Sequence, residues 1–190
     1  LKGRCLINID RGWNSWDSIF KAVLHHGMAN QIIFKSPPEK RYLQHMADQS
    51  EPFLYMPIVW YPEEVALAEQ YDLNMVAVEV IGYREDAPIM DAAYLEKLKE
   101  KGLVRLISSL TLANPLEDVE AEFRKWGQSR MKGAVLDRNI LLSGGHDDDT
   151  SILGDPDKGW GWLVERGFNA IQTDWTLALN LYLHEKGYNL

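Results

Sequence analysis

The chain has 190 residues, of which 46% are hydrophobic, 11% aromatic and 25% charged, and this is the composition of one folded globular domain, not of a disordered or fibrous chain. A formal charge of −8 and the absence of a basic run argue against general nucleic-acid binding, although a small anionic group could still bind at local positive charge. Cys5 is the only cysteine, which excludes an intrachain disulfide and a multi-cysteine zinc site.

The apolar runs are far shorter than the roughly 18 residues that a membrane helix requires, and the first residues lack the order of a signal peptide. We therefore expect a soluble protein without a transmembrane segment. The sequence leaves the compartment open, either cytoplasmic or exported. Because the chain begins with Leu1 and not Met, we also expect a processed product or a piece of a longer chain.

Six short segments rich in Val, Ile and Leu recur along the chain between turn residues, which is typical of strands buried on both faces. In chain order they are Cys5 to Asp10, Gln31 to Lys35, Phe53 to Trp60, Asn74 to Ile81, Leu103 to Leu110, and Asn169 to Asp174.

Helical spacing and helix-end signals predict seven helices between and after these strands. The first carries an apolar stripe that includes Trp16 and Phe20 and ends at Gly27. The second is expected to open with a capping box, Ser36 to Glu39. The others begin with a proline or a capping residue, or close the chain, near Pro62, Pro88, Asn114-Pro115, Asp155-Pro156 and Thr176.

Repeated strand-then-helix units predict parallel strands with right-handed crossovers, in a barrel or in an open doubly wound sheet. Six units in 190 residues match about three quarters of an eightfold barrel, so the sequence looks two units short. The lack of a Gly-rich loop after the first strand disfavours a nucleotide-binding open sheet. The irregular stretch from Gln128 to Gly154 is long enough to be functional or mobile.

Polar residues stand where five of the predicted strands stop, and in parallel architectures ligands gather at those carboxyl ends. Converging acids and a lysine could hold a divalent cation and a phosphate group. The residues at the strand ends are Asn8 and Asp10, Lys35, Trp60, Glu79, Ser108 and Ser109, and Asp174.

Simpler interpretations stay open for each of these residues. Lys35 could be a solvated surface lysine. Asp10 and Asp174 could cap the following helices, and Glu79 could pair with a basic residue on a neighbouring strand. The run from Gly144 to Asp149 looks like a metal loop, but a solvated acidic loop is the better default.

Four segments near the end of the chain form a recognisable series: Leu142 to Asp149, Gly154 to Asp157, Gly159 to Trp162, and Gly167 to Asp174 with its Gln-Thr-Asp ending. This series resembles the carboxyl-terminal part of glycerophosphodiester phosphodiesterases. Leu6 to Asp10 and Gln31 to Lys35 are further matches, so the resemblance spans essentially the whole chain.

The resemblance implies a TIM barrel, here one partial domain over residues 1–190 whose strands would be the third to eighth of that barrel. It implies a hydrolase of lipid metabolism that uses a divalent cation, Mg²⁺ or Ca²⁺, and two histidines to cleave phosphodiesters to an alcohol and a phosphomonoester. The resemblance further implies that the metal ligands are Asp10 and Asn8. It implies that the phosphate or substrate contacts are Lys35, Trp60, Glu79 and Asp174.

The chain also departs from that family. The paired catalytic histidines and two acidic ligands would lie ahead of Leu1, so we expect no hydrolysis by these 190 residues alone. Trp175-Thr176 stands in place of an Arg-Pro pair, and Ser108 to Thr111 in place of an Asn-Ser-Leu-Trp-like stretch.

Three functional interpretations remain. The first is an enzyme of the phosphodiesterase type acting on a small phosphodiester, inactive or completed by another chain. The second is a non-catalytic module that binds a phosphate or head group, and the third is a self-contained open α/β sheet without an active site. An incomplete barrel would expose two strand edges, which predicts homo-oligomerisation or edge capping.

Overall fold

Six parallel strands form one continuous sheet in the computed structural model, which describes residues 1–110 and 142–188. The strands follow one another in the sheet in chain order, so each is hydrogen-bonded to its neighbours in sequence. They are β1 (Ile7–Ile9), β2 (Ile32–Ser36), β3 (Leu54–Val59), β4 (Ala77–Val80), β5 (Val104–Ser108) and β6 (Ala170–Gln172). All six predicted strands are confirmed. Five are shorter than their apolar runs, and β2 keeps its predicted length but begins and ends one residue later.

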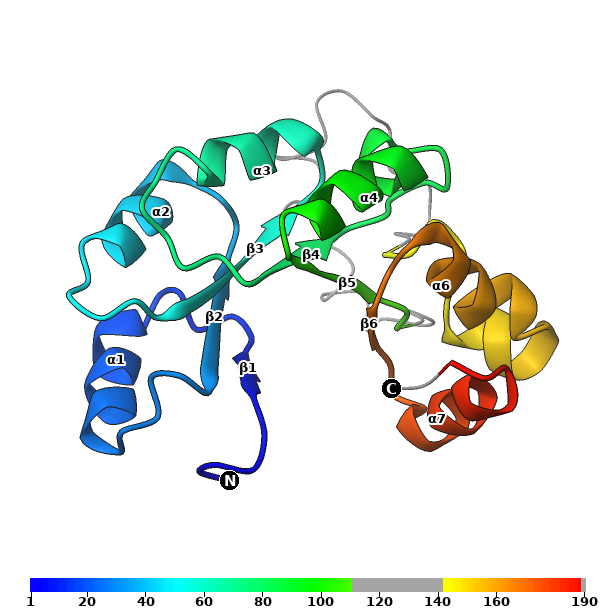
Figure 1. Cartoon of the computed structure of the whole chain (residues 1–190), viewed down its shortest axis with the longest axis horizontal. Helices are drawn as coiled ribbons and strands as arrows, with labels where there is room; N and C mark the ends of the chain where they lie inside the picture. Colours follow the sequence, from blue (N-terminus) through cyan, green and yellow to red (C-terminus); the bar gives the residue numbers. More distant parts are fainter. Residues whose placement is uncertain (111–141, 189–190) are drawn as a thin grey trace, which may run out of the picture.

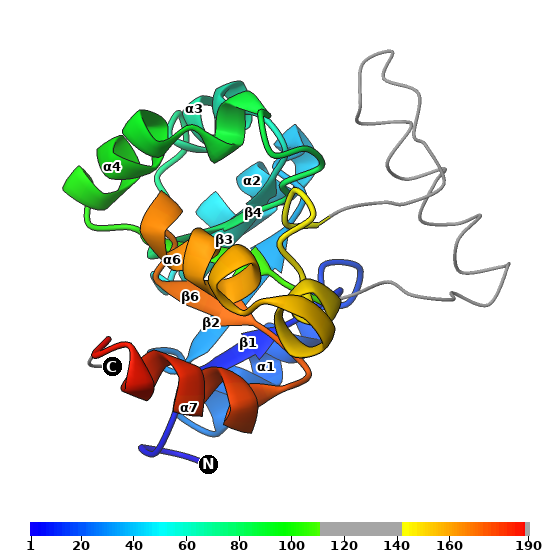
Figure 2. The same ribbon diagram turned by 90° about the vertical axis from the view of Figure 1, so that its right-hand side faces the viewer.

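The sheet curls, with the helices along its convex side (Figure 1). The α-helices of the described residues are α1 (Trp16–His25), α2 (Lys40–Ala47), α3 (Pro62–Ala68), α4 (Ala92–Glu100), α6 (Trp162–Arg166) and α7 (Thr176–Glu185). Figure 2 shows α6 and α7 on the side of the molecule where β6 ends the sheet. The fold is therefore an α/β structure whose curled, all-parallel sheet is compatible with an incomplete barrel.

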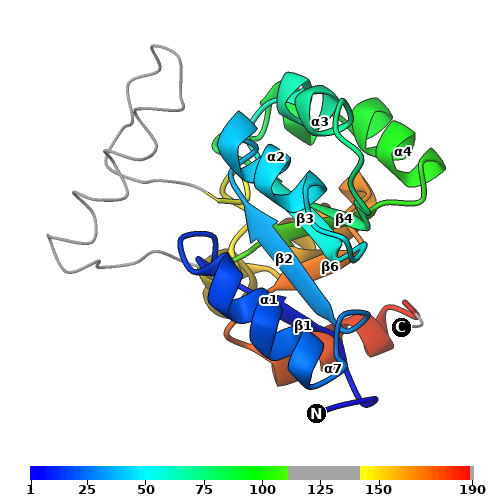
Figure 3. The ribbon, with the colours of Figure 1, turned by 90° about the vertical axis from the view of Figure 1, so that its left-hand side faces the viewer.

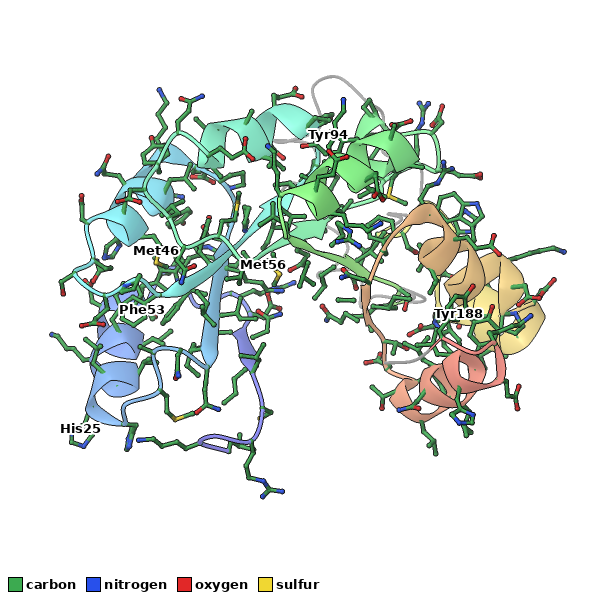
Figure 4. The ribbon with its side chains drawn as sticks, in the orientation of Figure 1. His25, Met46, Phe53, Met56, Tyr94 and Tyr188 are labelled. Atoms are coloured by element: carbon green, nitrogen blue, oxygen red, sulfur yellow. The ribbon has the colours of Figure 1, made fainter. Side chains whose placement is uncertain are left out.

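The apolar core lies between the convex face of the sheet and the helices. Around β2 it is built from aromatic rings, such as Phe20 of α1 stacked on Phe53 at a centroid distance of 4.7 Å and Phe34 of β2 packed against both. Figure 3 shows α1 and α2 beside β2, and Figure 4 places Met46 and Phe53 in this layer. Burial of these large rings holds the helices onto the sheet.

The concave face is set by the register of the parallel pairs. Met56 lies opposite Lys35, Ile58 lies opposite Glu79, and Glu79 lies opposite Leu106. Because successive residues of a strand point to opposite faces, the alternate positions of all six strands line the same concave surface. Figure 4 shows Met56 on this side of the sheet.

Two predicted helix starts are corrected by the structure. Ser36 is the last residue of β2 and not a cap, because its hydroxyl donates to the Pro37 carbonyl and lies 2.9 Å from the Tyr55 hydroxyl. The helix predicted from Pro88 is split at Asp91, whose extended backbone ends a short 3₁₀ turn. The Asp91 side chain then accepts the Tyr94 N–H and starts α4.

The later helix ends follow the sequence signals more closely. Gly167 ends α6 with φ 115°, and Gly187 follows α7 with φ 77°, both in the left-handed region that favours glycine. The helix predicted from Asn114 lies outside the described residues, as does the first half of the irregular stretch. The second half contains single turns of π-helix at Thr150–Gly154 and Asp157–Gly161.

The two edges of the sheet are β1 and β6, each with one neighbouring strand within the described residues. Oligomerisation through these edges stays a prediction. In residues 1–110 and 142–188, every helix is too short or too polar to cross a lipid bilayer.

Candidate functional site at the carboxyl ends of the strands

A lysine and two carboxylates meet at the carboxyl ends of β1, β2 and β4. The Lys35 ammonium lies 2.6 Å from Glu79 Oε2 and 3.1 Å from Asp10 Oδ1. The side chains of Lys35 and Glu79 are only 3% and 8% exposed, whereas Asp10 is 58% exposed. We call these three residues the rim triad.

The parallel topology explains how the rim triad forms. Ile9 pairs with Phe34, so Asp10 follows directly opposite Lys35 across the edge pair of strands. Strand β3 lies between β2 and β4, so the Lys35 side chain crosses the inner face of β3 to reach Glu79. Only a long, flexible side chain spans that distance, and its methylene groups tolerate the apolar surface of Met56 and Ile58.

The rim triad carries more negative than positive charge when both acids are ionised. Burial raises the pKa of Glu79 above its usual range, and the nearby Asp10 charge raises it further, while the Lys35 ammonium opposes both. A carboxylate that is nine-tenths buried is costly unless it is paired. The short contact with Lys35 therefore favours the ionised form of Glu79 and opposes the effect of burial.

The raised pKa predicts how Glu79 affects stability. Both folded and unfolded chains hold a protonated Glu79 at low pH, but above the unfolded pKa only the folded chain must pay to ionise it. The contribution of Glu79 to stability is therefore lost as the pH rises through its folded pKa. In Glu79→Gln this loss of stability with rising pH should be absent. The free energy of unfolding in urea, measured for both proteins from pH 4 to 8, should therefore differ by an amount that changes with pH. A pH-independent difference would contradict the assignment.

The two triad carboxylates provide part of a divalent-cation site. Mg²⁺ is commonly bound through one or two carboxylates, with substrate phosphate and water completing its shell. Asp10 and Glu79 fit that partial donor set, and among the described residues no group of three or more His, Cys, Asp or Glu side chains is arranged to hold a metal alone. Asn8, two residues before Asp10 on the same face, is exposed.

The other two predicted substrate contacts, Asp174 and Trp60, are not members of the triad. Asp174 follows β6, at the opposite edge of the sheet from β1, where it is exposed and its backbone N–H donates to Asp148. Trp60 follows β3 and is fully buried, with its ring stacked near Tyr83 at a centroid distance of 6.0 Å. Their substrate contacts stay predictions.

Several of the simpler interpretations can now be judged. The side chain of Lys35 is buried, so it is not a solvated surface lysine. Ser15 and Trp175 hold the cap positions of α1 and α7, so the caps are not Asp10 and Asp174. Glu79 does pair with a lysine, although that lysine is two strands away and not on an adjacent strand.

Asp148 is a buried acid that the sequence pattern did not single out. It is 2% exposed, and its Oδ1 accepts hydrogen bonds from Ser109 Oγ, Trp160 Nε1 and Thr173 Oγ1 at 2.6–2.9 Å. Its Oδ2 accepts the Asp174 N–H at 3.2 Å. The expectation of a solvated acidic loop is therefore wrong for Asp148, which ties this segment to the ends of β5 and β6.

Nothing in the sequence distinguishes Asp148 from its acidic neighbours. Asp147 is half-buried and Asp149 is exposed, although the three aspartates are consecutive. The two donors that set Asp148 apart in the structure, Trp160 and Thr173, lie 12 and 25 residues further along the chain. A single sequence does not show that the two donors fold back onto one carboxylate.

Comparison with known proteins places the chain in a family without an assigned function. No curated protein matches the chain. One family model, DUF4996, described as a domain of unknown function, matches residues 55–183, which run from the second residue of β3 past β6 and include Glu79 and Asp148. That match covers more than half of the 190 residues, and the chain therefore belongs to the DUF4996 family.

Proposed function

We propose that this protein binds a small phosphate ester at the rim triad together with a divalent cation, as in a phosphodiesterase-type barrel. The observation that carries this proposal is the buried Lys35 ammonium held between Glu79 and Asp10 at the carboxyl ends of parallel strands. Ligand sites in parallel α/β folds are built at those ends. A buried lysine there is a point charge suited to a phosphate oxygen.

The charge of the triad makes a cation part of the proposal. With Glu79 and Asp10 ionised, the three side chains sum to one negative charge, which repels a phosphate group. A divalent cation held by the two carboxylates reverses that sign and, when bound, neutralises charge on the phosphate oxygens. Lys35 then orients the ester, because Glu79 and Asp10 fix its ammonium on the inner face.

Binding is better supported than hydrolysis within these residues. Four of the five histidines of the chain lie on the helical layer, at the end of α1 and on α2 and α7. The fifth, His146, stacks on Trp162 at 3.7 Å, and its Nδ1 lies 2.5 Å from the Lys158 carbonyl. The rim triad itself therefore contains no histidine for acid-base chemistry.

Calorimetric titration tests the proposal directly. We expect glycerol 3-phosphate to bind in the presence of Mg²⁺ or Ca²⁺, and to bind about tenfold or more weakly in EDTA. Asp10→Asn removes one carboxylate from an exposed position, so the fold is kept while cation-dependent binding falls about tenfold. Equal affinity with and without a cation would refute the charge argument, and no binding in either condition would refute the proposal.

A hydrolysis assay separates the two phosphodiesterase-like alternatives. We expect glycerophosphodiesters to remain intact with the chain and either cation, which favours a binding module or an enzyme completed by another chain. Clear turnover that Lys35→Arg reduces would show instead that acid-base groups within these residues suffice. Lys101→Met, at an exposed ion pair with Glu69, serves as the control for both assays.

A further inference from the structure

The polar lining of the concave face continues beyond the rim triad onto β5 and β6. Glu79 lies opposite Leu106, and Ser108 stands two residues further along β5 on the same face. Ser108 in turn lies opposite Gln172 of β6. An acid, a hydroxyl and an amide thus follow one another on three adjacent strands, where barrel interiors normally carry bulky apolar residues.

Ser108 is buried without a hydrogen-bond partner among the described residues. It is 3% exposed, and its Oγ is one of the few buried polar atoms left unsatisfied. A buried hydroxyl without a partner is destabilising, so such groups in native proteins commonly serve a ligand or a water molecule. The neighbouring Ser109 differs, because its hydroxyl donates to Asp148.

Gln172 brings a second neutral group to the same place. It is half-buried, and its backbone carbonyl accepts hydrogen bonds from Ser109. Its side-chain amide offers one acceptor and two donors, while Ser108 can donate and accept. A hydroxyl between them could donate to one and accept from the other.

We propose that Ser108 and Gln172 form a neutral subsite that takes a hydroxyl group on the alcohol portion of the ester. This inference rests on the proposed function, since the phosphate is held by the rim triad and the alcohol portion extends from β4 towards β6. The subsite carries no charge, so it adds little affinity for phosphate itself. Its effect is selectivity, because an alkyl chain would leave the buried Ser108 hydroxyl unpaired.

A pair of esters that differ only in hydroxyl groups tests the subsite. Glycerol 3-phosphate and propyl phosphate carry the same charge and the same carbon number. We expect the wild-type chain with Mg²⁺ to bind glycerol 3-phosphate about tenfold more tightly. Ser108→Ala and Gln172→Leu are each expected to reduce that ratio to about two, by weakening glycerol 3-phosphate and leaving propyl phosphate and inorganic phosphate unchanged.

Ser36→Ala is the matched control, because it deletes another fully buried serine hydroxyl on the opposite face of the sheet. The ratio of its affinities for glycerol 3-phosphate and propyl phosphate should equal that of the wild type. Equal binding of the two esters by the wild-type chain, or a ratio that Ser108→Ala and Gln172→Leu do not change, would overturn the subsite while the rim triad still binds phosphate. If inorganic phosphate and both esters fail to bind with Mg²⁺, the proposed function itself has failed.

Discussion

Replacing Lys35 with methionine is expected to destabilise the fold by about 3–5 kcal/mol at pH 8, because it leaves a buried carboxylate without its cation. Methionine keeps much of the length and apolar character of the lysine stem, so the loss reports the missing charge more than a cavity. Urea unfolding followed by circular dichroism measures the difference. The Lys35 charge and Glu79 are both nearly excluded from solvent, so salt should reduce the effect little.

Two companion measurements isolate the charge pair. The loss in Lys35→Met should shrink at pH 5, where Glu79, whose pKa burial raises, is more readily protonated. The double variant Lys35→Met with Glu79→Leu should recover a large part of the stability, because no unpaired charge is left in the interior. A double variant as unstable as the sum of the two single variants would show that the two side chains act independently.

An exposed ion pair provides the comparison. Lys101 pairs with Glu69 on the surface of the helical layer, and such pairs contribute little. Lys101→Met should therefore leave the unfolding midpoint nearly unchanged. If Lys35→Met and Lys101→Met had the same small effect, the Lys35 ammonium would not be needed to keep Glu79 buried.

Replacing Asp148 with alanine is expected to cost about 3–4 kcal/mol, because the change removes the acceptor of several donors, among them the buried Trp160 indole. Trp160 Nε1 and Thr173 Oγ1 lose their bonds to Oδ1, and Ser109 Oγ keeps only its bond to the Gln172 carbonyl. Thermal and urea unfolding measure this loss. The near-ultraviolet circular dichroism of the tryptophans should also change, since the Trp160 indole is held by Asp148.

The neighbouring acid is a matched control for Asp148. Asp149 belongs to the same acidic triplet but is exposed, so Asp149→Asn should alter stability by no more than about 0.5 kcal/mol. The loss of stability in Asp148→Asn should lie between those of Asp148→Ala and Asp149→Asn. The amide retains one acceptor oxygen but turns an N–H donor towards the donors around Asp148. Equal effects for Asp148→Ala and Asp149→Asn would contradict the anchoring role of Asp148.

Asp148 also links stability to the candidate site. It holds the backbone after β6 through the Asp174 N–H and holds the end of β5 through Ser109. In the proposed neutral subsite, Ser108 directly precedes Ser109, and Gln172 lies two residues before Asp174. The order of the subsite therefore depends on an acid from a segment that is distant in sequence.

The sequence patterns were most informative where structure is local. Apolar runs of strand length located all six strands, and Gly167 and Gly187 marked two helix ends, because a strand or a cap depends on a few consecutive residues. The capping box at Ser36 failed for a reason that is not local. The Tyr55 hydroxyl from the next strand lies beside the Ser36 side chain, and β2 continues through that residue.

The site shows the same division. The sequence by itself determined that acids and a lysine stand at strand ends, and that parallel strands bring such ends to one side. Only the tertiary structure decided that Lys35 crosses β3 to reach Glu79, that Asp174 lies at the far edge, and that Asp148 is buried. The physical reason is that burial and pairing depend on the curl of the sheet and on contacts between distant segments, whereas periodicity and turn chemistry act over a few residues.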